Sequence, residues 1–457
     1  IERVAGELGV KPNIGLRIKL VSAGQGRWSS SAGEYSKFGL NPMELMEALE
    51  IAKSKNILDC VKLIHFHLGS QITNIRRIKN SLKEVGRFYS ELMRFGCNIE
   101  YIDVGGGLGI DYDGSRSTFA SSTNYSVQEY ANDVVYHLLE ICKSENLPHP
   151  NIISESGRAM TAHHSILVVN VLDVTSFPEW SDEINVSKDR PEAVKEIFNV
   201  LNSTSNKNLI ESWHDAVHLK EEAQSKFLLG LISLADRALI ERIYWGICRK
   251  IEKLSSRLKF LPDDIRNLRT RLADKYFCNF SVFQSVPDSW AIDQVFPVVP
   301  LHRLNEEPDR DATLEDITCD SDGRIDNFIG TNRGTENTLR VHSLKEDESY
   351  SLCIFLTGAY QEILGDLHNL FGDTNTVHVS LKEDGTINYE QIIEGEDVAD
   401  VLDYVQFSAD ELAGRIDGFL IGCVQRGVVT QQEADDFLAL YKEGLNGYTY
   451  LVKPDAD

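Results

Sequence analysis

Hydrophobic and polar positions follow two alternating periods through the first third of the chain. Residues 13–21 alternate apolar and polar side chains with a period of two, which predicts a strand. Asn41, Pro42 and Glu44 offer an N-cap, a proline at the first helical position and an acid in the first turn, so a helix is expected to begin there. The apolar residues of this helix recur at helical spacing, at Leu45, Ala48, Leu49 and Ala52.

The order of strand and helix continues through residue 155. The later helix of this part opens with Ser126 and Glu129 at the spacing of a capping box. This repeat is typical of parallel strands joined by helical crossovers, and roughly half of a (β/α)₈ barrel would fit it. The further elements that we expect are strands near 57–66, up to Val104 and over 151–155, and helices near 75–95 and 126–146.

The pattern then changes twice. Residues 164–176 are expected to form a long strand, and a charged region with apolar residues at helical spacing follows up to residue 261. This region predicts an insertion of three helices with apolar positions at Ile197, Leu201, Trp213, Val217, Phe227 and Leu231. Strand-like segments return at 312–318, 351–357, 376–381 and 386–393. The end of the chain is helical, with a second capping-box spacing at Ser408 and Glu411.

The patterns together predict an α/β fold joined to an all-β part. We expect a partial (β/α)₈ barrel that binds ligands at the carboxyl ends of its strands. The predicted parts are the C-terminal part of the barrel at 1–163, a linking strand at 164–177, a helical insertion at 178–270, a β-sandwich or β-barrel domain at 271–407 and a C-terminal helical segment at 408–457.

Composition narrows the class of partner. The chain has 457 residues, of which 42% are hydrophobic and 25% charged, which is ordinary for a soluble globular protein. Its formal net charge of −24 argues against nucleic acid and anionic membranes as partners. Apolar runs are too short for a membrane span. The eight cysteines contain no CxxC pair, so we expect reduced thiols and a cytoplasmic location.

A glycine run is the most prominent candidate site. Tyr101 to Val104 is expected to end a buried strand, and Gly105, Gly106 and Gly107 follow directly. A turn without β-carbons lets backbone N–H groups converge on an anion such as a phosphate, although a tight turn without a ligand would have the same sequence. A dinucleotide fingerprint is a poor match, because Ile110 occupies the sixth position, where the motif needs Gly or Ala.

Polar residues crowd the ends of other predicted strands. His65, His67 and Ser70 follow one strand, and Ser70 could add a phosphate contact. Glu155 follows another strand, where a buried carboxylate needs a partner. Arg158 is one possible partner; alternatively, Glu155 pairs with a protonated ring nitrogen and Arg158 lies near a phosphate.

Two candidate groups lie in the predicted all-β part. Cys319 and Asp320 precede a turn, and the thiol could donate a proton or could simply be a small buried apolar group. The acids around them lack the spacing of a calcium loop. Tyr360 offers a hydroxyl at another strand end. The sequence shows neither convincing zinc spacing nor a Gly-x-Ser-x-Gly elbow.

These segments, taken in order, resemble the fold-type III pyridoxal-phosphate decarboxylases, which include ornithine and diaminopimelate decarboxylases and share a barrel with alanine racemase. The likeness is greatest to the biosynthetic arginine decarboxylases, and it runs nearly from end to end, helical insertion included. The segments that carry it are 36–40, 65–72, 102–112, 155–164, 279–294, 316–323, 358–373 and 447–451.

The resemblance implies roles for the candidate residues. His67 would stack on the cofactor ring, Glu155 would pair with the ring nitrogen, and Cys319 would reprotonate the product carbon. Asp320 would hold the distal cation of the substrate, and both Cys319 and Asp320 would act in the active site of a partner subunit. The implied phosphate-binding residues are Ser70, Gly105, Gly106, Gly107, Arg158 and Tyr360, and Gly157 is a further implied cofactor-binding residue. The implied substrate-binding stretch is Ile102, Asp103, Val104, Gly105, Gly106, Gly107, Leu108, Gly109, Ile110, Asp111 and Tyr112.

One family motif has no counterpart. The family's Schiff-base lysine lies on the first barrel strand, and no segment here matches that strand. Lys37 belongs to a different motif and is not assigned this role. The chain begins at Ile1 rather than Met, so we expect an N-terminal portion with that lysine upstream.

The sequence thus predicts pyridoxal-phosphate-dependent decarboxylation of L-arginine to agmatine and CO₂. Ornithine or diaminopimelate decarboxylation is the alternative within the fold, and an inactive regulatory homologue is the alternative outside catalysis. The resemblance also implies a homodimer with shared active sites that assembles to a tetramer. Mg²⁺ is associated with the family, but the sequence shows no ligand set for it.

Overall fold

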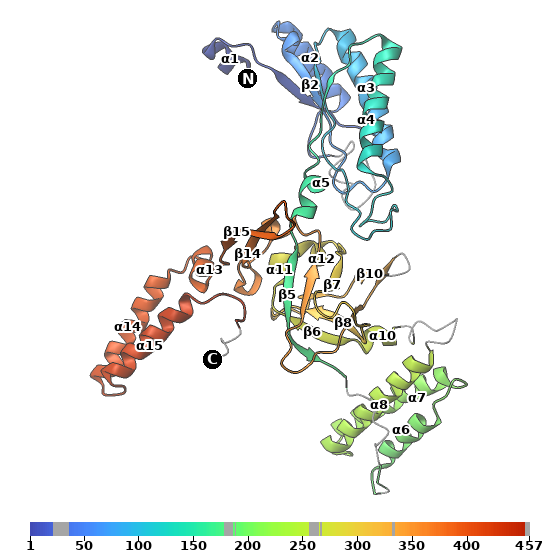
Figure 1. Ribbon diagram of the computed structural model, residues 1–457, viewed down its shortest axis with the longest axis vertical. Coiled ribbons are helices and arrows are strands. Elements are labelled where there is room, and N and C mark those ends of the chain that lie inside the picture. The colour runs from blue at the N-terminus through green and yellow to red at the C-terminus, as the bar shows by residue number, and fades with distance from the viewer. Residues whose placement is uncertain are drawn as a thin grey trace.

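The computed structural model describes residues 1–21, 36–177, 186–187, 189–255, 265, 267–330 and 334–452. Figure 1 shows a parallel sheet with its helices at one end, a β-rich part in the middle, a group of three long helices at the other end and the C-terminal helices to one side. The Gly/Ser-rich stretch at 22–33 falls outside the described residues.

Four parallel strands form the first sheet, in the order β1-β2-β3-β4. Helical connections lie between successive strands, as the sequence pattern predicts. The strands are β1 (Ile14–Arg17), β2 (Val61–His65), β3 (Tyr101–Asp103) and β4 (Asn151–Ile153), and the helices are α1 (Glu2–Leu8), α2 (Pro42–Ser54), α3 (Ile75–Phe95), α4 (Val127–Glu145) and α5 (Gly157–Thr161).

Side-chain caps fix where several helices begin. Asn41 accepts a hydrogen bond from the Glu44 N–H at 2.9 Å, and Glu44 accepts one from the Asn41 N–H at 2.8 Å, which completes a capping box at α2. Ser126 accepts from the Glu129 N–H at 3.1 Å, but the structure shows only this half of the predicted box. Ser408 likewise makes one of the two bonds.

The sheet and its helices enclose one apolar core. Ile64 and Ile102, on the two central strands, are fully buried against Val85 and Tyr89 of α3 and Leu138 of α4. Burial of each such side chain contributes roughly 1.5–3 kcal/mol. This core fixes the strand ends that carry the candidate site.

Three long helices form the insertion: α6 (Glu192–Ser203), α7 (Leu209–Leu228) and α8 (Leu234–Ser255). They have a core of their own, in which Ile197, Leu201 and Trp213 are buried, as predicted. Leu231 is the exception, because it lies in the turn between α7 and α8 and is 68% exposed.

The central part is a seven-stranded mixed sheet in the order β12-β8-β6-β5-β13-β7, with β9 paired to β8. Short helices lie between the strands of residues 271–407, and α13 (Val398–Tyr404) begins within this range. Ser281 caps the first of these helices, and Pro287 opens the second. The strands are β5 (Leu167–Thr175), β6 (Asp274–Cys278), β7 (Val298–Pro300), β8 (Arg310–Glu315), β9 (Arg324–Ile325), β12 (Leu339–Val341) and β13 (Ser351–Ile354).

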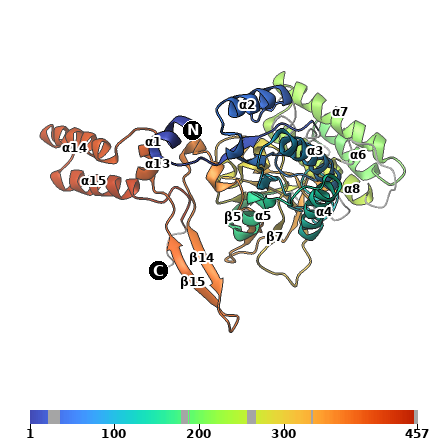
Figure 2. The ribbon, with the colours of Figure 1, turned by 90° about the horizontal axis from the view of Figure 1, so that it is seen from above.

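The remaining elements lie around this sheet. Figure 2 shows the β14–β15 hairpin extending away from the body, with α14 and α15 packed side by side. Among the described residues, no helix combines the length and the apolar character that a membrane span needs. These elements are α10 (Leu268–Arg271), α11 (Val282–Ser285), α12 (Pro287–Ala291), β10 (Phe328–Ile329), β11 (Thr335–Glu336), β14 (Thr376–Leu381), β15 (Ile387–Ile393), α13 (Val398–Tyr404), α14 (Ala409–Gln425) and α15 (Gln431–Leu445).

Candidate active site

The candidate residues of the first sheet gather at one edge. His65 and Asp103 are register partners at the ends of β2 and β3, and Glu155 lies two residues beyond β4. Because the strands are parallel, their carboxyl ends meet at the same edge, where ligands bind in such sheets. The glycine run follows β3 directly.

Backbone geometry explains two of the three glycines. Gly105 has a φ of +65°, and a β-carbon there would lie 2.2 Å from the Phe66 carbonyl oxygen. Gly107 has a φ of +96°, and its β-carbon would lie 2.4 Å from the Gly69 carbonyl oxygen. A side chain would therefore be both strained and blocked at these positions. The run packs closely against the chain that follows β2, and it leaves an edge free of side chains.

Arg158 lies beside this edge, and its side chain is buried. Its guanidinium donates to the Tyr112 hydroxyl at 2.9 Å and to Ser70 Oγ at 3.0 and 3.3 Å, and it lies 4.6 Å from the ring centroid of Tyr360. The pairing with Glu155 that the sequence left open is not among the ion pairs of the described residues. A buried cation with only neutral partners can bind an anion, since its charge is otherwise uncompensated.

His65, Asp103 and Glu155 form the acid–base group of the edge. Nε2 of His65 lies 3.7 Å from Oε2 of Glu155, and Asp103 Oδ1 accepts the Gly105 N–H at 2.9 Å. Burial lowers the pKa of His65, while burial and the neighbouring Glu155 raise the pKa of Asp103. The three have ligand atoms within 4.8 Å of one another, but an imidazole with two carboxylates is not a set that Mg²⁺ prefers.

His67, two residues beyond the end of β2, faces the glycine run. Its Nδ1 accepts the Gly106 N–H at 3.1 Å, which fixes the ring beside the edge. Burial and the nearby Arg17 lower the pKa of His67, so its ring is held in the neutral form. A neutral imidazole of fixed orientation can stack on a flat ligand.

The segment from Ile102 to Tyr112 continues past the glycines and packs beneath the candidate site. Val104, Leu108 and Ile110 are buried, and Asp111 accepts a hydrogen bond from Ser122 Oγ at 2.6 Å. Gly109 packs closely in the same segment, since a β-carbon there would lie 2.5 Å from a Thr123 methyl group.

Sequence reasoning assigned no role to Gln71, although it holds this segment in place. Its side chain accepts the Ile110 N–H at 2.9 Å and donates to the Ile110 carbonyl at 2.6 Å. Its position directly after Ser70, in a polar strand end, was the available signal.

Cys319 and Asp320 form a second cluster, in the turn between β8 and β9. Cys319 is exposed, and its N–H donates to Asn369 Oδ1 at 3.2 Å. Asp320 Oδ2 lies 3.0 Å from Nε2 of His368. His368 and Asn369 belong to a segment that the sequence analysis matched to the family without giving these two residues a role.

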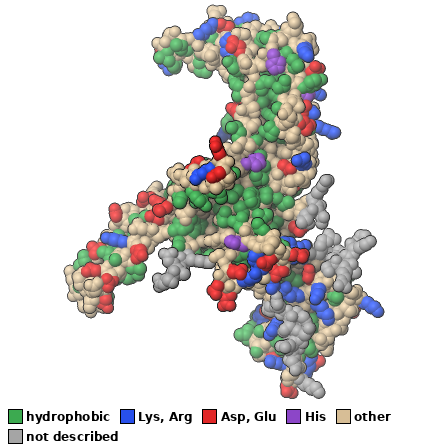
Figure 3. All heavy atoms as spheres, viewed as in Figure 1, with side chains coloured by type: hydrophobic (Ala, Val, Ile, Leu, Met, Phe, Trp, Pro, Cys, Tyr) green, Lys and Arg blue, Asp and Glu red, His purple; other side chains and the backbone are tan. Residues whose placement is uncertain are grey.

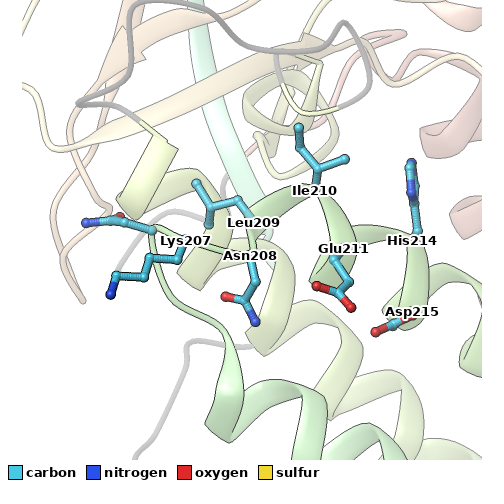
Figure 4. Close-up of a pocket in the computed structure, with 8 residues that line it drawn as sticks. Lys207, Asn208, Leu209, Ile210, Glu211, His214 and Asp215 are labelled. Carbon is cyan, nitrogen blue, oxygen red and sulfur yellow. The ribbon is translucent and has the colours of Figure 1, made fainter.

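A surface hollow elsewhere contains none of the predicted residues. It lies at the start of α7 in the helical insertion, and Figure 4 shows Glu211, His214 and Asp215 along its side. The residues that line this hollow belong to neither the strand-edge site nor the Cys319–Asp320 cluster.

Family models match three parts of the chain. The model for the pyridoxal-dependent decarboxylase, pyridoxal binding domain matches residues 1–162. The arginine decarboxylase helical bundle domain matches 187–269, and the arginine decarboxylase C-terminal helical extension matches 398–451. The biosynthetic arginine decarboxylase of Bacteroides thetaiotaomicron is 54% identical over 452 residues, which cover 99% of this chain and 71% of that protein. The chain belongs to the biosynthetic arginine decarboxylase family.

Other members and solved structures agree with this placement. The biosynthetic arginine decarboxylase of Rhodopirellula baltica is 44% identical and matches 98% of this chain and 71% of its own length. The crystal structure of the family member from Campylobacter jejuni superposes with a TM-score of 0.79 at 34% identity, over 97% of this chain and 70% of that one. Diaminopimelate decarboxylase from Helicobacter pylori, at 15% identity and a TM-score of 0.51 over 89% and 70%, shares the fold. The predicted fold class is thereby confirmed.

Proposed function

We propose that the protein decarboxylates L-arginine to agmatine and CO₂ with pyridoxal 5'-phosphate as cofactor, as the first step of agmatine and polyamine synthesis. Membership in the family supports the reaction. The observation in the site that supports it most directly is the buried Arg158 guanidinium, whose partners among the described residues are hydroxyl and aromatic groups beside a glycine edge. Such a place suits the phosphate of the cofactor.

The residues present fit this cofactor. Arg158 and Ser70 would bind the phosphate, together with the edge of Gly105, Gly106 and Gly107, where a side chain would be blocked at the first and third positions. Gly157 and Tyr360 complete this set, since Gly157 opens α5 and the Tyr360 ring faces Arg158. His67 would lie against the ring, and Glu155 would accept a hydrogen bond from its nitrogen. When bound, the cofactor supplies the electron sink for decarboxylation.

The chain's own groups have distinct tasks in this proposal. The Glu155 carboxylate would keep a proton on the ring nitrogen, and Nε2 of His65 lies 3.7 Å from this carboxylate, beyond hydrogen-bond distance. The Cys319 thiol gives a proton to the product carbon, and Asp320 binds the substrate guanidinium. The segment from Ile102 to Tyr112, with Asp103 and Gly109 in it, shapes the space for the rest of the substrate, and Asp288 to Trp290 would border the distal end.

Assembly forms part of the same proposal. Large apolar side chains beside the site are exposed, with Met160 80% and Ile363 87% accessible, and apolar atoms cover much of the face seen in Figure 3. Apolar surface of this kind is typical of a protein interface. We propose a homodimer in which Cys319 and Asp320 serve the partner's site, with further assembly to a tetramer. The predicted domain boundaries and Mg²⁺ as a metal partner stay predictions.

The cysteines bear on the cellular compartment of the protein. All eight cysteines are free thiols, and seven of them are buried. Unpaired cysteines are usual in reducing compartments. We propose a cytoplasmic enzyme.

A substrate comparison tests the function. The product of the full open reading frame, supplied with pyridoxal phosphate, should release CO₂ from carboxyl-labelled arginine far faster than from ornithine, lysine or diaminopimelate. A site built to pair a distal guanidinium leaves its acid unpaired with the wrong amino acid. Equal rates on ornithine would favour the alternative decarboxylases. Cofactor binding without release of CO₂ from any amino acid would favour a regulatory homologue.

A further inference from the structure

We propose that His368 is a positioning residue that orients the Asp320 carboxylate for a guanidinium, and thereby makes the site prefer arginine to amino acids with a distal ammonium. This inference rests on the proposed function, in which Asp320 binds the substrate's distal cation. It adds His368 to the residues to which the family resemblance assigns a role.

Asp320 is held at both of its carboxylate oxygens. His368 Nε2 lies 3.0 Å from Oδ2, and the Asp322 N–H donates to Oδ1 at 2.9 Å. With a proton on Nε2, His368 donates a hydrogen bond to this oxygen. Each oxygen can accept a further hydrogen bond. The two bonds therefore fix the plane of the carboxylate and still leave both of its oxygens able to bind a substrate.

His368 is itself fixed by aromatic packing. Its ring meets the Phe283 ring edge-on at 4.7 Å, and Phe283 meets Trp290 in the same way at 5.1 Å. Phe283 is buried, while His368 and Asp320 have side chains 40% and 35% exposed. The His368 ring thus packs against a buried side chain, and the His368–Asp320 pair remains accessible to a ligand.

Asn369, the residue after His368, contacts Cys319, the other member of the cluster. Asn369 has a φ of +58°, and its side chain accepts the Cys319 N–H at 3.2 Å. One short segment therefore contacts both neighbours in the turn: Asn369 accepts from the Cys319 backbone, and His368 bonds to the Asp320 carboxylate. A bond between two partly exposed side chains adds little to folding stability, so the contact is better explained by orientation than by stability.

Orientation matters unequally for the two kinds of substrate. A guanidinium is planar and binds a carboxylate through two parallel N–H···O bonds, which require the carboxylate plane to be aligned. An ammonium is a compact charge that approaches a carboxylate from many directions. A residue that fixes the plane of Asp320 should favour arginine selectively, whereas a residue needed only for folding should affect every substrate alike.

The test compares three variants. His368→Phe keeps a ring against Phe283 but removes the donor, and His368→Gln restores an N–H donor. His302→Phe is the matched control, because His302 lies near Tyr350 in the same part of the chain and is not placed in the site. For each we would measure kcat and KM for arginine, lysine and ornithine, and the affinity of agmatine and of cadaverine by calorimetry.

His368→Phe should lower kcat/KM for arginine about tenfold, mainly through KM, and change the slow rates on lysine and ornithine less than about twofold. Agmatine should bind about tenfold more weakly and cadaverine as before, with partial recovery in His368→Gln and no effect of His302→Phe. An unchanged arginine preference, or equal losses on all substrates, would overturn the inference. A wild-type enzyme that does not act on arginine would overturn the proposed function instead, and the calorimetry would still test His368 separately.

Discussion

The guanidinium carbon of Arg158 lies 4.6 Å from the centroid of the Tyr360 ring. The contact joins α5, at the end of the parallel sheet, to the turn that follows β13 in the seven-stranded sheet. Tyr360 adopts a φ of +66°, which costs a residue other than glycine about 1 kcal/mol. A cation–π contact of a buried guanidinium can offset a cost of that size. The phosphate site that we propose therefore depends on both sheets.

Replacement of Arg158 by Lys tests this site. Lysine keeps the charge but cannot reach the Tyr112 and Ser70 hydroxyls together, so the dissociation constant of pyridoxal phosphate should rise about tenfold or more. Equilibrium dialysis with the purified protein would measure it. Arg415→Lys, at an exposed ion pair on α14, is the control and should bind normally. Wild-type affinity in Arg158→Lys would place the phosphate elsewhere.

Substitutions at two glycines with positive φ distinguish the cost of backbone strain from the cost of a steric clash. A β-carbon at Gly107 would lie 2.4 Å from the Gly69 carbonyl, whereas at Gly114, with a φ of +69°, it would meet nothing within 4 Å. Gly114→Ala should cost about 1 kcal/mol of unfolding free energy, and Gly107→Ala should cost several times more and weaken cofactor binding. Thermal unfolding and dialysis would measure both. Similar losses would show that the close packing of the run is unimportant.

The sequence predicted this fold best where local patterns decide the structure. Helix α3 spans Ile75–Phe95, within the range expected from the chain alone, and the glycine run ends β3 as expected. Periodicity and turn residues act over a few positions, so they are visible in one segment. The predicted capping box at Ser126 formed only in part, since the choice between side-chain partners depends on a few tenths of a kcal/mol.

Contacts between distant segments were not predictable in this way. His368 lies 48 positions from Asp320, and Gln71 lies 39 positions from Ile110. No periodic pattern connects such pairs, and they form only because the fold brings distant segments together. The resemblance to a family pointed to Glu155 and Arg158, but it did not show that Arg158 bonds to Tyr112 rather than to the glutamate.

Glu155→Gln tests electrostatic support of the cofactor ring. The amide keeps the shape of the side chain but loses the charge that favours a protonated ring nitrogen. The variant should retain cofactor binding within about threefold and lose turnover by roughly two to three orders of magnitude, as when a preorganised electrostatic partner is removed. Steady-state kinetics at saturating arginine would measure the loss. Near-normal turnover would exclude this role of Glu155.

Cys319→Ala tests the proton donor and the shared site together. Product formation should slow, and some turnovers should place the proton on the cofactor carbon and release an aldehyde, which can be quantified by chromatography. If Cys319 acts in the partner's site, a mixture of Cys319→Ala and Glu155→Gln should recover up to about a quarter of wild-type activity, because hybrid dimers contain one intact site. Absence of recovery in refolded mixtures would contradict a shared site.

Asp103 and Asp236 should respond to pH in opposite directions. Burial, with a smaller contribution from Glu155, raises the pKa of Asp103, so its ionisation disfavours the folded state as the pH rises above the ordinary carboxyl range. Hydrogen bonds from Ser233 and Arg190 lower the pKa of Asp236, so its ionisation favours the folded state.

Asp103→Asn should therefore raise the Tm of the cofactor-free protein at pH 7, because the amide oxygen can still accept the Gly105 N–H and no charge is buried. The gain should shrink as the pH falls toward the unfolded carboxyl pKa of about 4, where wild-type Asp103 is protonated in both states. Asp236→Asn should lower the Tm at pH 7, and that loss should also fade in acid. Calorimetry of the three proteins from pH 4 to 8 would measure the curves. A lower Tm for Asp103→Asn at pH 7 would show that the charge of Asp103 stabilises the strand edge, with His65 as its compensating partner.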